Sequence, residues 1–304
     1  MKRRLLIGSI LAVSLIAIGT IAYFKTRDLG SIESILARLP SDDAPILSID
    51  FASLRRSGIL DLLSGPVVEE EPEYKVFVEK TAFDYRRDLD HAFVAFHPSG
   101  IYFLVQGRFD WKHLEAYARE QGGGCFNTLC RMPGSVPPRK ISFFPLKSNL
   151  LAMAVSADDF AATRMNEPAK PARPMAILKQ PVWLLLPAAT LKKSSEFPTG
   201  TQLFAKAMEG AESATLSLAP QGKSIEAQLV VVCRSAQEAS VLAAQLQRVT
   251  EVLRQLIEKE KQKPTPADLA GILTAGVFHQ EDARVLGRWP IERAFLDSLA
   301  GKPR

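Results

Sequence analysis

The chain has 304 residues, of which 47% are hydrophobic and 23% are charged, and this is long enough for one large or two ordinary folded domains. Its formal charge is +5, but Lys2, Arg3 and Arg4 supply three of these charges. The rest of the chain is therefore close to neutral, so its charge is no evidence for nucleic-acid binding, because these numbers require no strong basic patch. We expect no nucleic-acid partner.

The N-terminal cations precede an uncharged, mostly apolar run over residues 5–24. This matches the roughly 20 residues that a helix needs to cross a bilayer. We predict an uncleaved signal anchor over residues 1–27 and a single-pass protein of the inner (cytoplasmic) membrane. The cations favour a cytoplasmic N-terminus, with the lobes in the periplasm or outside. A cleaved signal peptide and a buried N-terminal helix of a soluble protein are the alternatives.

Residues 28–43, which include SIESILARL, are predicted as a juxtamembrane helix and linker, and a first lobe follows over residues 44–167. The helix that is predicted in the middle of this lobe has Asp110 as its N-cap and Gly122 as its C-terminal stop. The elements of the lobe, in chain order, are an apolar strand (PILSID), a short helix, a hairpin over 91–109, the helix over 110–122, a hairpin over 141–156 and a short closing helix.

The connection after the second helix, GGGCFNTLCRMPG, carries Cys125 and Cys130 with four residues between them. In an oxidising compartment these cysteines are predicted to form a disulfide that closes a small loop. Free thiols and a metal or redox site are the alternatives, but no second Cys or His pair has the spacing of a zinc site. Cys233 follows an apolar run and is predicted to be a buried strand thiol. This loop is a preferred contact region, and its candidate residues are Phe126, Arg131 and Met132.

Residues 168–180 are rich in proline and are predicted to link the first lobe to a second lobe over residues 181–304. The sequence ASLRRS at 52–57 matches ATLKKS at 189–194, an offset of 137 residues. Hairpins and helices then follow in the same order in both lobes. The predicted fold class is α+β: a transmembrane helix, then two duplicated β-α-ββ-α-ββ-α lobes with mainly antiparallel sheets. Two unrelated α+β domains are the alternative.

The long helix that is predicted over residues 235–261 has apolar residues at alternating spacings of three and four, which is heptad spacing. Packing on the sheet of the same lobe and contact with a second copy, in a homodimer, would both produce this seam. Its candidate residues are Leu242, Leu246, Val249, Leu253 and Leu256.

The sequence contains none of the motifs that name a reaction. Gly-x-Ser-x-Gly, Gly-x-Gly-x-x-Gly, the Walker loop and His-Glu-x-x-His are all absent from it. The four histidines are dispersed, and no pair of them has metal-ligand spacing. We therefore expect no catalytic residue, no metal and no cofactor, and we do not expect an enzyme.

The openings of the two lobes, LPSDDAPILSIDFASLRRSG and QPVWLLLPAATLKKSS, are similar to the first strand of uncharacterised bacterial envelope proteins. The entry to the second helix, GRFDW, resembles the same group. These proteins have an N-terminal membrane segment followed by tandem α+β lobes. The resemblance implies a fold and a compartment, and it transfers no functional residue.

The anchor, the duplication and the missing catalytic motifs together favour a membrane-anchored extracytoplasmic binding or scaffolding protein. Its expected partner is another envelope protein or a peptide. One alternative is a small-molecule or lipid receptor that uses the cleft between the lobes. A second alternative is an envelope enzyme with an unrecognised site.

Overall fold

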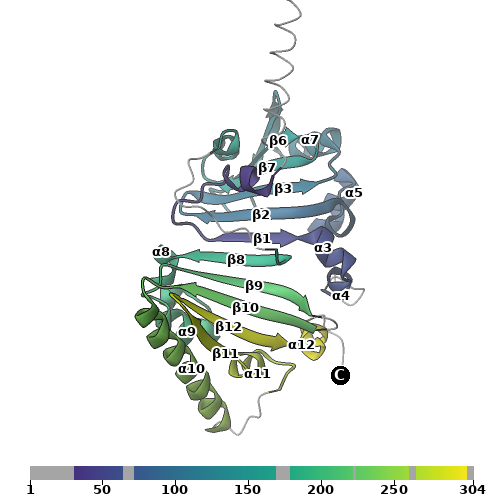
Figure 1. Cartoon of the computed structure of the whole chain (residues 1–304). Helices are drawn as coiled ribbons and strands as arrows, with labels where there is room; N and C mark the ends of the chain where they lie inside the picture. Colours follow the sequence, from purple (N-terminus) through teal and green to yellow (C-terminus); the bar gives the residue numbers. More distant parts are fainter. Residues whose placement is uncertain (1–30, 64–71, 169–178, 222–223, 260–264, 300–304) are drawn as a thin grey trace, which may run out of the picture.

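Twelve strands in the described part of the chain form one antiparallel sheet that runs through the whole molecule (Figure 1). The structure is a computed structural model. It describes residues 31–63, 72–168, 179–221, 224–259 and 265–299. The α+β class and the antiparallel pairing are confirmed. The two lobes do not carry separate sheets, however, because their first strands pair with each other.

The strands of the first half follow one another in the chain, as do those of the second. The first half contains β1 (Ile46–Asp50), β2 (Leu89–His97), β3 (Gly100–Gly107), β4 (Gly124–Phe126), β5 (Leu129–Pro133), β6 (Lys140–Lys147) and β7 (Leu150–Ser156). The second half contains β8 (Val182–Pro187), β9 (Ser213–Gln221), β10 (Ser224–Val232), β11 (Val277–Glu281) and β12 (Arg284–Ile291). In space the order is β11-β12-β10-β9-β8-β1-β2-β3-β7-β6-β5-β4.

The two halves run their strands in the same spatial order. This order is β1-β2-β3-β7-β6 in the first half and β8-β9-β10-β12-β11 in the second. At the join, Leu47 of β1 lies opposite Leu184 of β8. These two leucines are 137 positions apart in the chain, the same offset that separates the matching sequences. Because the pair is antiparallel, a pseudo-twofold axis passes between Leu47 and Leu184.

Short helices connect the strands, and one long helix lies in the second half. The helices of the first half are α2 (Ile32–Leu36), α3 (Phe51–Arg56), α4 (Ile59–Leu63), α5 (Pro72–Thr81), α6 (Tyr85–Asp88), α7 (Trp111–Glu120) and the 3-10 helix η1 (Ala161–Met165). Those of the second half are α8 (Ala188–Leu191), η2 (Ser194–Glu196), η3 (Thr199–Thr201), α9 (Gln202–Ala207), α10 (Ala236–Lys259), α11 (Leu269–Thr274) and α12 (Arg293–Leu299).

Both faces of the first half are covered by helices. On one face, Ile35, Leu36 and Leu39 are fully buried in the core that includes Phe93 and Tyr102 of the sheet. The helix predicted as a juxtamembrane segment, α2, is therefore part of this core. On the opposite face, α7 packs against β5, β6 and β7.

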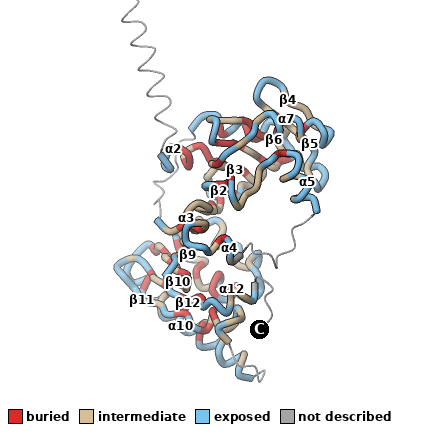
Figure 2. The backbone as a smooth tube through the Cα atoms, turned by 90° about the vertical axis from the view of Figure 1, so that its right-hand side faces the viewer, coloured by how far each residue is buried: buried red, intermediate tan, exposed pale blue. Residues whose placement is uncertain are grey.

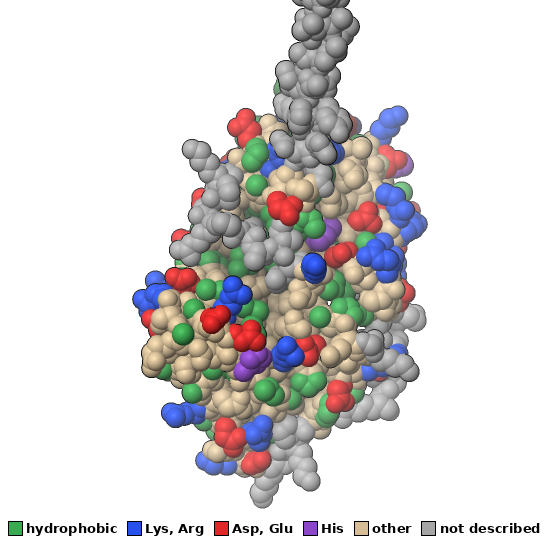
Figure 3. All heavy atoms as spheres, viewed as in Figure 1, with side chains coloured by type: hydrophobic (Ala, Val, Ile, Leu, Met, Phe, Trp, Pro, Cys, Tyr) green, Lys and Arg blue, Asp and Glu red, His purple; other side chains and the backbone are tan. Residues whose placement is uncertain are grey.

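The second half covers one face of its sheet and leaves the other face polar. Residues from α9, α10 and α11 form a single core with the apolar face. Figure 2 colours the buried positions of this half red. On the open face, Gln228 of β10 lies beside Arg288 of β12. Figure 3 views the sheet from this side and shows cations and carboxylates intermixed over it. Charged and amide side chains alternate on this face with apolar ones such as Val230 and Leu286.

Two segments differ from the sequence-based predictions. Residues 122–140, which were predicted as a loop, contain the hairpin β4–β5. Residues 72–81 form α5, which was not predicted. Pro72 is its first residue, a position that proline favours because the missing N–H would have no partner there.

None of the helices in the described ranges combines the length and the apolarity that a membrane crossing requires. The apolar run at residues 5–24 lies outside the described residues, so the anchor stays a prediction.

Candidate contact site at the disulfide-linked hairpin

The site is built on the hairpin β4–β5, which extends the sheet beyond β6. A two-residue turn joins the strands, and its first residue, Asn127, has a φ of 53°. Asparagine is one of the few residues that adopt this left-handed conformation readily. β5 then pairs with β6 from Cys130 to Pro133. The hairpin lies at the end of the molecule that is farthest from the second half (Figure 2).

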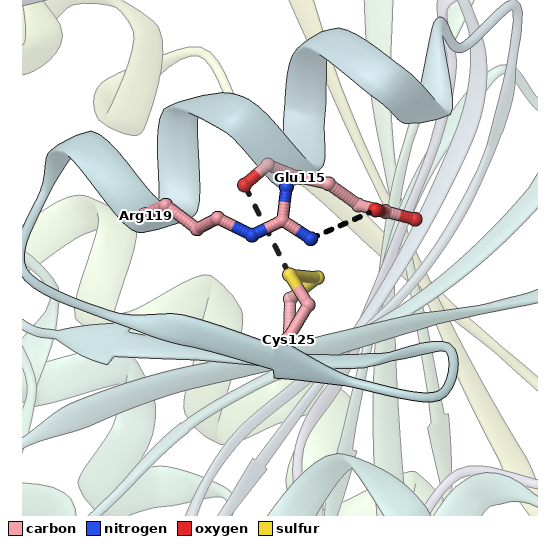
Figure 4. Close-up of a disulfide and its surroundings, with 4 residues drawn as sticks. Glu115, Arg119 and Cys125 are labelled. Carbon is pink, nitrogen blue, oxygen red and sulfur yellow. Dashed lines mark hydrogen bonds and ion pairs between the residues drawn. A yellow bond between two sulfur atoms is a disulfide. The ribbon is translucent and has the colours of Figure 1, made fainter.

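The predicted disulfide between Cys125 and Cys130 is confirmed, but it links two paired strands and does not close a loop. The cysteines face each other directly in the register, with their Cα atoms 4.0 Å apart. This pair neighbours the turn-closing, hydrogen-bonded pair, so it is a non-hydrogen-bonded pair, for which a separation of about 4.5 Å is normal. The disulfide lies beneath α7, where Cys125 Sγ is 4.0 Å from the carbonyl oxygen of Glu115 (Figure 4).

Gly122 and Gly123 between α7 and β4, and Gly124 at the start of β4, let the chain turn tightly into the hairpin. Gly122 has a φ of +75°, which ends the helix in a left-handed conformation. A Cβ on Gly123 would lie 2.0 Å from the carbonyl oxygen of Arg131, so only glycine fits there. A Cβ on Gly124 would meet nothing within 4 Å. Gly124 therefore borders open space, and this space is the candidate site.

A cleft of about 480 Å³ lies between the hairpin and the start of β6. Its lining residues are Gly122, Gly123, Gly124, Arg131, Met132, Pro133, Gly134, Pro137, Pro138, Arg139, Lys140 and Asp159. Three of them are cationic and one is acidic. Lys140 Nζ lies 2.8 Å from Asp159 Oδ1, so this acid offsets one of the cations. The guanidinium of Arg131 lies over the ring of Phe160, 4.9 Å from its centroid. The cleft thus keeps a net positive charge.

Three exposed apolar side chains belong to residues within two positions of a residue that lines the cleft, and we call them its apolar rim. Phe126 at the hairpin turn is 74% exposed, Val136 beyond the cleft is 59% exposed, and Phe160 is 53% exposed. Of the predicted contact residues, Phe126 lies on this rim, whereas Arg131 and Met132 line the cleft. An exposed aromatic side chain beside cations is typical of binding surfaces, because such side chains gain most when a partner covers them.

The seam of the long helix is used within the chain. Leu242 and Leu246 are buried in the core of the second half, and Val249 and Leu253 pack against the same core. Leu256 alone among the five candidates is exposed. Packing on the sheet therefore accounts for the heptad spacing, and the homodimer through this helix stays a prediction.

One polar contact was not predicted from the sequence. Ser48 Oγ on β1 lies 2.8 Å from His91 Nε2 on β2, and the imidazole stacks on the ring of Phe93. Burial lowers the pKa of His91, and the nearby Asp50 carboxylate opposes this shift. Ser48 is only 1% exposed, so its hydroxyl is out of reach of a substrate. The contact satisfies the buried hydroxyl of Ser48 and the partly buried imidazole of His91.

The odd cysteine lies where it was predicted. Cys233 directly follows β10 and is buried in the core of the second half. Burial raises the pKa of its thiol, and Glu238 and Glu212 add to the shift. A thiol with a raised pKa forms little thiolate and is therefore unreactive.

Comparison with known proteins gives a likeness of fold. No protein-family model matches the chain, and no curated protein matches it. Crystal form III of TP0453 is similar over 90% of this chain and 100% of that chain, with 12% sequence identity and a TM-score of 0.50. Crystal form I of TP0453 has 11% identity over 88% of this chain and 96% of that chain, with a TM-score of 0.46. The match to crystal form III therefore shows a likeness of fold between this chain and TP0453.

Proposed function

We propose that the protein is a membrane-anchored binding or scaffolding module of the bacterial envelope, and that its cleft holds an acidic segment of a partner protein. The observation that carries this proposal is the combination of a cationic cleft with an exposed apolar rim. Carboxylates of the partner would pair with Arg131 and Arg139, because guanidinium groups bind carboxylates with two parallel hydrogen bonds. Apolar side chains of the same segment would cover Phe126 and Phe160.

The rest of the architecture supports the same reading. α2 starts at the edge of the first-half core, so an anchor at residues 5–24 would hold this half close to the membrane. Six residues, 25–30, separate the run from Ser31, and even fully extended they reach only about 20 Å. The equal strand order of the halves, together with the offset of 137 residues, supports an internal duplication.

A receptor site between the lobes has less support. Such a site needs two bodies that enclose a ligand, usually around a hinge. Here β1 and β8 pair along four residues of each strand, so the halves meet in a continuous sheet.

The test is binding of a labelled peptide of alternating aspartate and phenylalanine, with an asparagine-for-aspartate peptide as its control. Gly124→Leu should fill the cleft and abolish binding. Gly210→Leu should not, although its Cβ also meets nothing within 4 Å. Arg139→Glu should weaken binding about fivefold, since one exposed ion pair contributes up to about 1 kcal/mol. Lys192→Glu makes the same charge change in the second half and should have little effect.

Added salt should weaken binding of the acidic peptide, because the pairs are exposed to solvent. If the acidic peptide bound Gly124→Leu and the unmodified protein equally well, the cleft would not be its binding site. Equal binding of the asparagine peptide would remove the charge preference.

A further inference from the structure

β11 is the outer strand of the second half, where α10 packs against it, and no strand of the described residues pairs with its outer side. In Figure 2 it lies at the margin of the molecule, and four of its five residues are exposed. A two-residue turn joins it to β12, with Glu281 paired to Arg284. The pair that closes such a turn is hydrogen-bonded, and the bonding then alternates along the strands. His279 and Val277 therefore bond to β12.

The main-chain groups of the residues in between, Phe278 and Gln280, point away from the sheet. Within the described residues, no main-chain hydrogen bond reaches them from another element. The side chain of Phe278 does not cover this edge, because its ring lies over Gly287 of β12 and meets Trp289 at 5.2 Å. The edge thus presents two free N–H groups and two free carbonyl oxygens in an extended strand.

The first half shows what the same architecture does with this position. β6 occupies the place that β11 occupies in the second half, and β6 has a further strand, β5, paired along its outer side. That pairing covers four residues of each strand, from Cys130 opposite Phe143 to Pro133 opposite Lys140. The sheet of the first half therefore accommodates an antiparallel strand at the equivalent place.

The strand β11 itself lacks three features that protect many edges. Its sequence, VFHQE, contains no proline and no lysine, and its register with β12 has no bulge. Val277 is 63% exposed on this strand. The outer strand at the other end, β4, is protected because it has only three residues and is held by the disulfide. The two halves thus differ at their outer strands: β6 has a further strand beside it, and β11 has none in the described residues.

We propose that the edge of β11 binds an extended strand of a partner protein, which adds to the sheet as β5 does beside β6. Such strand addition takes its affinity from main-chain hydrogen bonds and its specificity from alternate side chains. A second copy of β11 fits poorly, because antiparallel self-pairing about His279 would place Phe278 opposite Gln280 and the two imidazoles side by side. A strand with an apolar residue opposite Val277 fits better.

The test uses a lysine-capped peptide of alternating valine and threonine, with the full chain as receptor. Gln280→Pro removes one outward N–H and leaves the bonds to β12 intact, since proline is tolerated on the open side of an edge strand. Gln280→Ala loses the same side chain but keeps the N–H. We expect binding to Gln280→Ala within about twofold of the unmodified protein and binding to Gln280→Pro weaker by about tenfold or more.

Hydrogen exchange supplies the second measurement. The amides of Phe278 and Gln280 should exchange fast in the free protein and slowly with the peptide, whereas those of Val277 and His279 should be protected throughout. Slow exchange of Gln280 in the free protein, equal binding to the proline and alanine variants, or no binding at millimolar peptide would each overturn the inference. The cleft variant Gly124→Leu should bind this peptide normally, so the outcome is independent of the proposed function.

Discussion

Reduction of the Cys125–Cys130 disulfide tests the part that the hairpin plays in the fold. Reduction breaks the bond between the two sulfur atoms and leaves every other side chain as it was. Its effect is therefore easier to interpret than that of a substitution. The bond closes a ring of six residues. On the chain-entropy model, a ring of this size stabilises the folded state by about 2 kcal/mol. This is a sizeable part of the roughly 5–15 kcal/mol that a folded protein possesses.

The assay is urea unfolding of the oxidised and the reduced protein, followed by far-ultraviolet circular dichroism. The midpoint should fall while the slope stays unchanged, since the same surface is exposed on unfolding. In the folded protein Cys233 should not react, because burial raises the pKa of its thiol and keeps it protonated. Alkylation before reduction should therefore label no cysteine in the folded protein, and alkylation after reduction should label Cys125.

A second readout separates local from global effects. β4 has three residues and is the outermost strand, so the amides of Gly124 and Phe126 should exchange faster after reduction. Protection of β6 and β7 should persist, because their pairing does not depend on the bond. A stability loss above about 4 kcal/mol, or lost protection in β7, would refute this reasoning, since a six-residue ring cannot supply so much. An unchanged midpoint would refute it as well.

Three further substitutions test the core, the buried histidine and the glycine turn. Leu246→Ala should lower the free energy of unfolding in urea by about 2–5 kcal/mol, because Leu246 is fully buried. Val241→Ala, on the exposed side of the same helix, should lower it little. Equal losses in the two variants would contradict the packing of the seam. Burial lowers the pKa of His91 below its unfolded value of about 6.5, so the folded protein should lose stability as the pH drops below about 6.5. This loss of stability should be smaller in His91→Gln. Identical pH profiles of stability for the two proteins would contradict the role of His91. Gly123→Ala should destabilise the protein, because the added Cβ would lie 2.0 Å from a carbonyl oxygen. Gly124→Ala should not destabilise it. An unchanged thermal unfolding midpoint in Gly123→Ala would contradict the geometry.

The sequence predicted the strands that alternate clearly or flank good turns. The hairpins at residues 91–109 and 141–156 are confirmed as β2–β3 and β6–β7, because long apolar strands around Pro98-Ser99 and Ser148-Asn149 leave few alternatives. The hairpin β4–β5 was not predicted, because the three residues of β4, which begin with Gly124, have little strand propensity of their own. That hairpin forms because β6 offers an edge and because the disulfide holds the strands in register.

Features that depend on the meeting of distant segments could not be predicted. The polar Ser48 gave no sign that β1 lies at the centre of the sheet, yet β2 and β8 flank it on both sides. The heptad spacing of α10 was ambiguous for a similar reason. A helix on a sheet and a helix in a coiled coil both bury every third or fourth residue. The cleft was only partly predictable: Arg131 and Met132 are in it, but its other cations come from β6 and the turn before it.

The difference between the two halves follows from the chemistry of alternate positions in equivalent strands. By register, Phe93 and Ala95 of β2 correspond to Thr215 and Ser217 of β9. The apolar pair lies in a core that α2 and η1 complete. The polar pair belongs to neither hydrophobic core, although Ser217 is buried opposite Trp183 and Thr215 is half-buried. The hydrophilic residues of the second copy therefore reduce the apolar surface that a covering helix would bury. The first half uses both faces for stability and has its cleft at the sheet end, and the second half keeps a face and an edge accessible. If the halves arose by duplication, one strand order has given two different contact surfaces, which is why our proposals place different partners at opposite ends of the sheet.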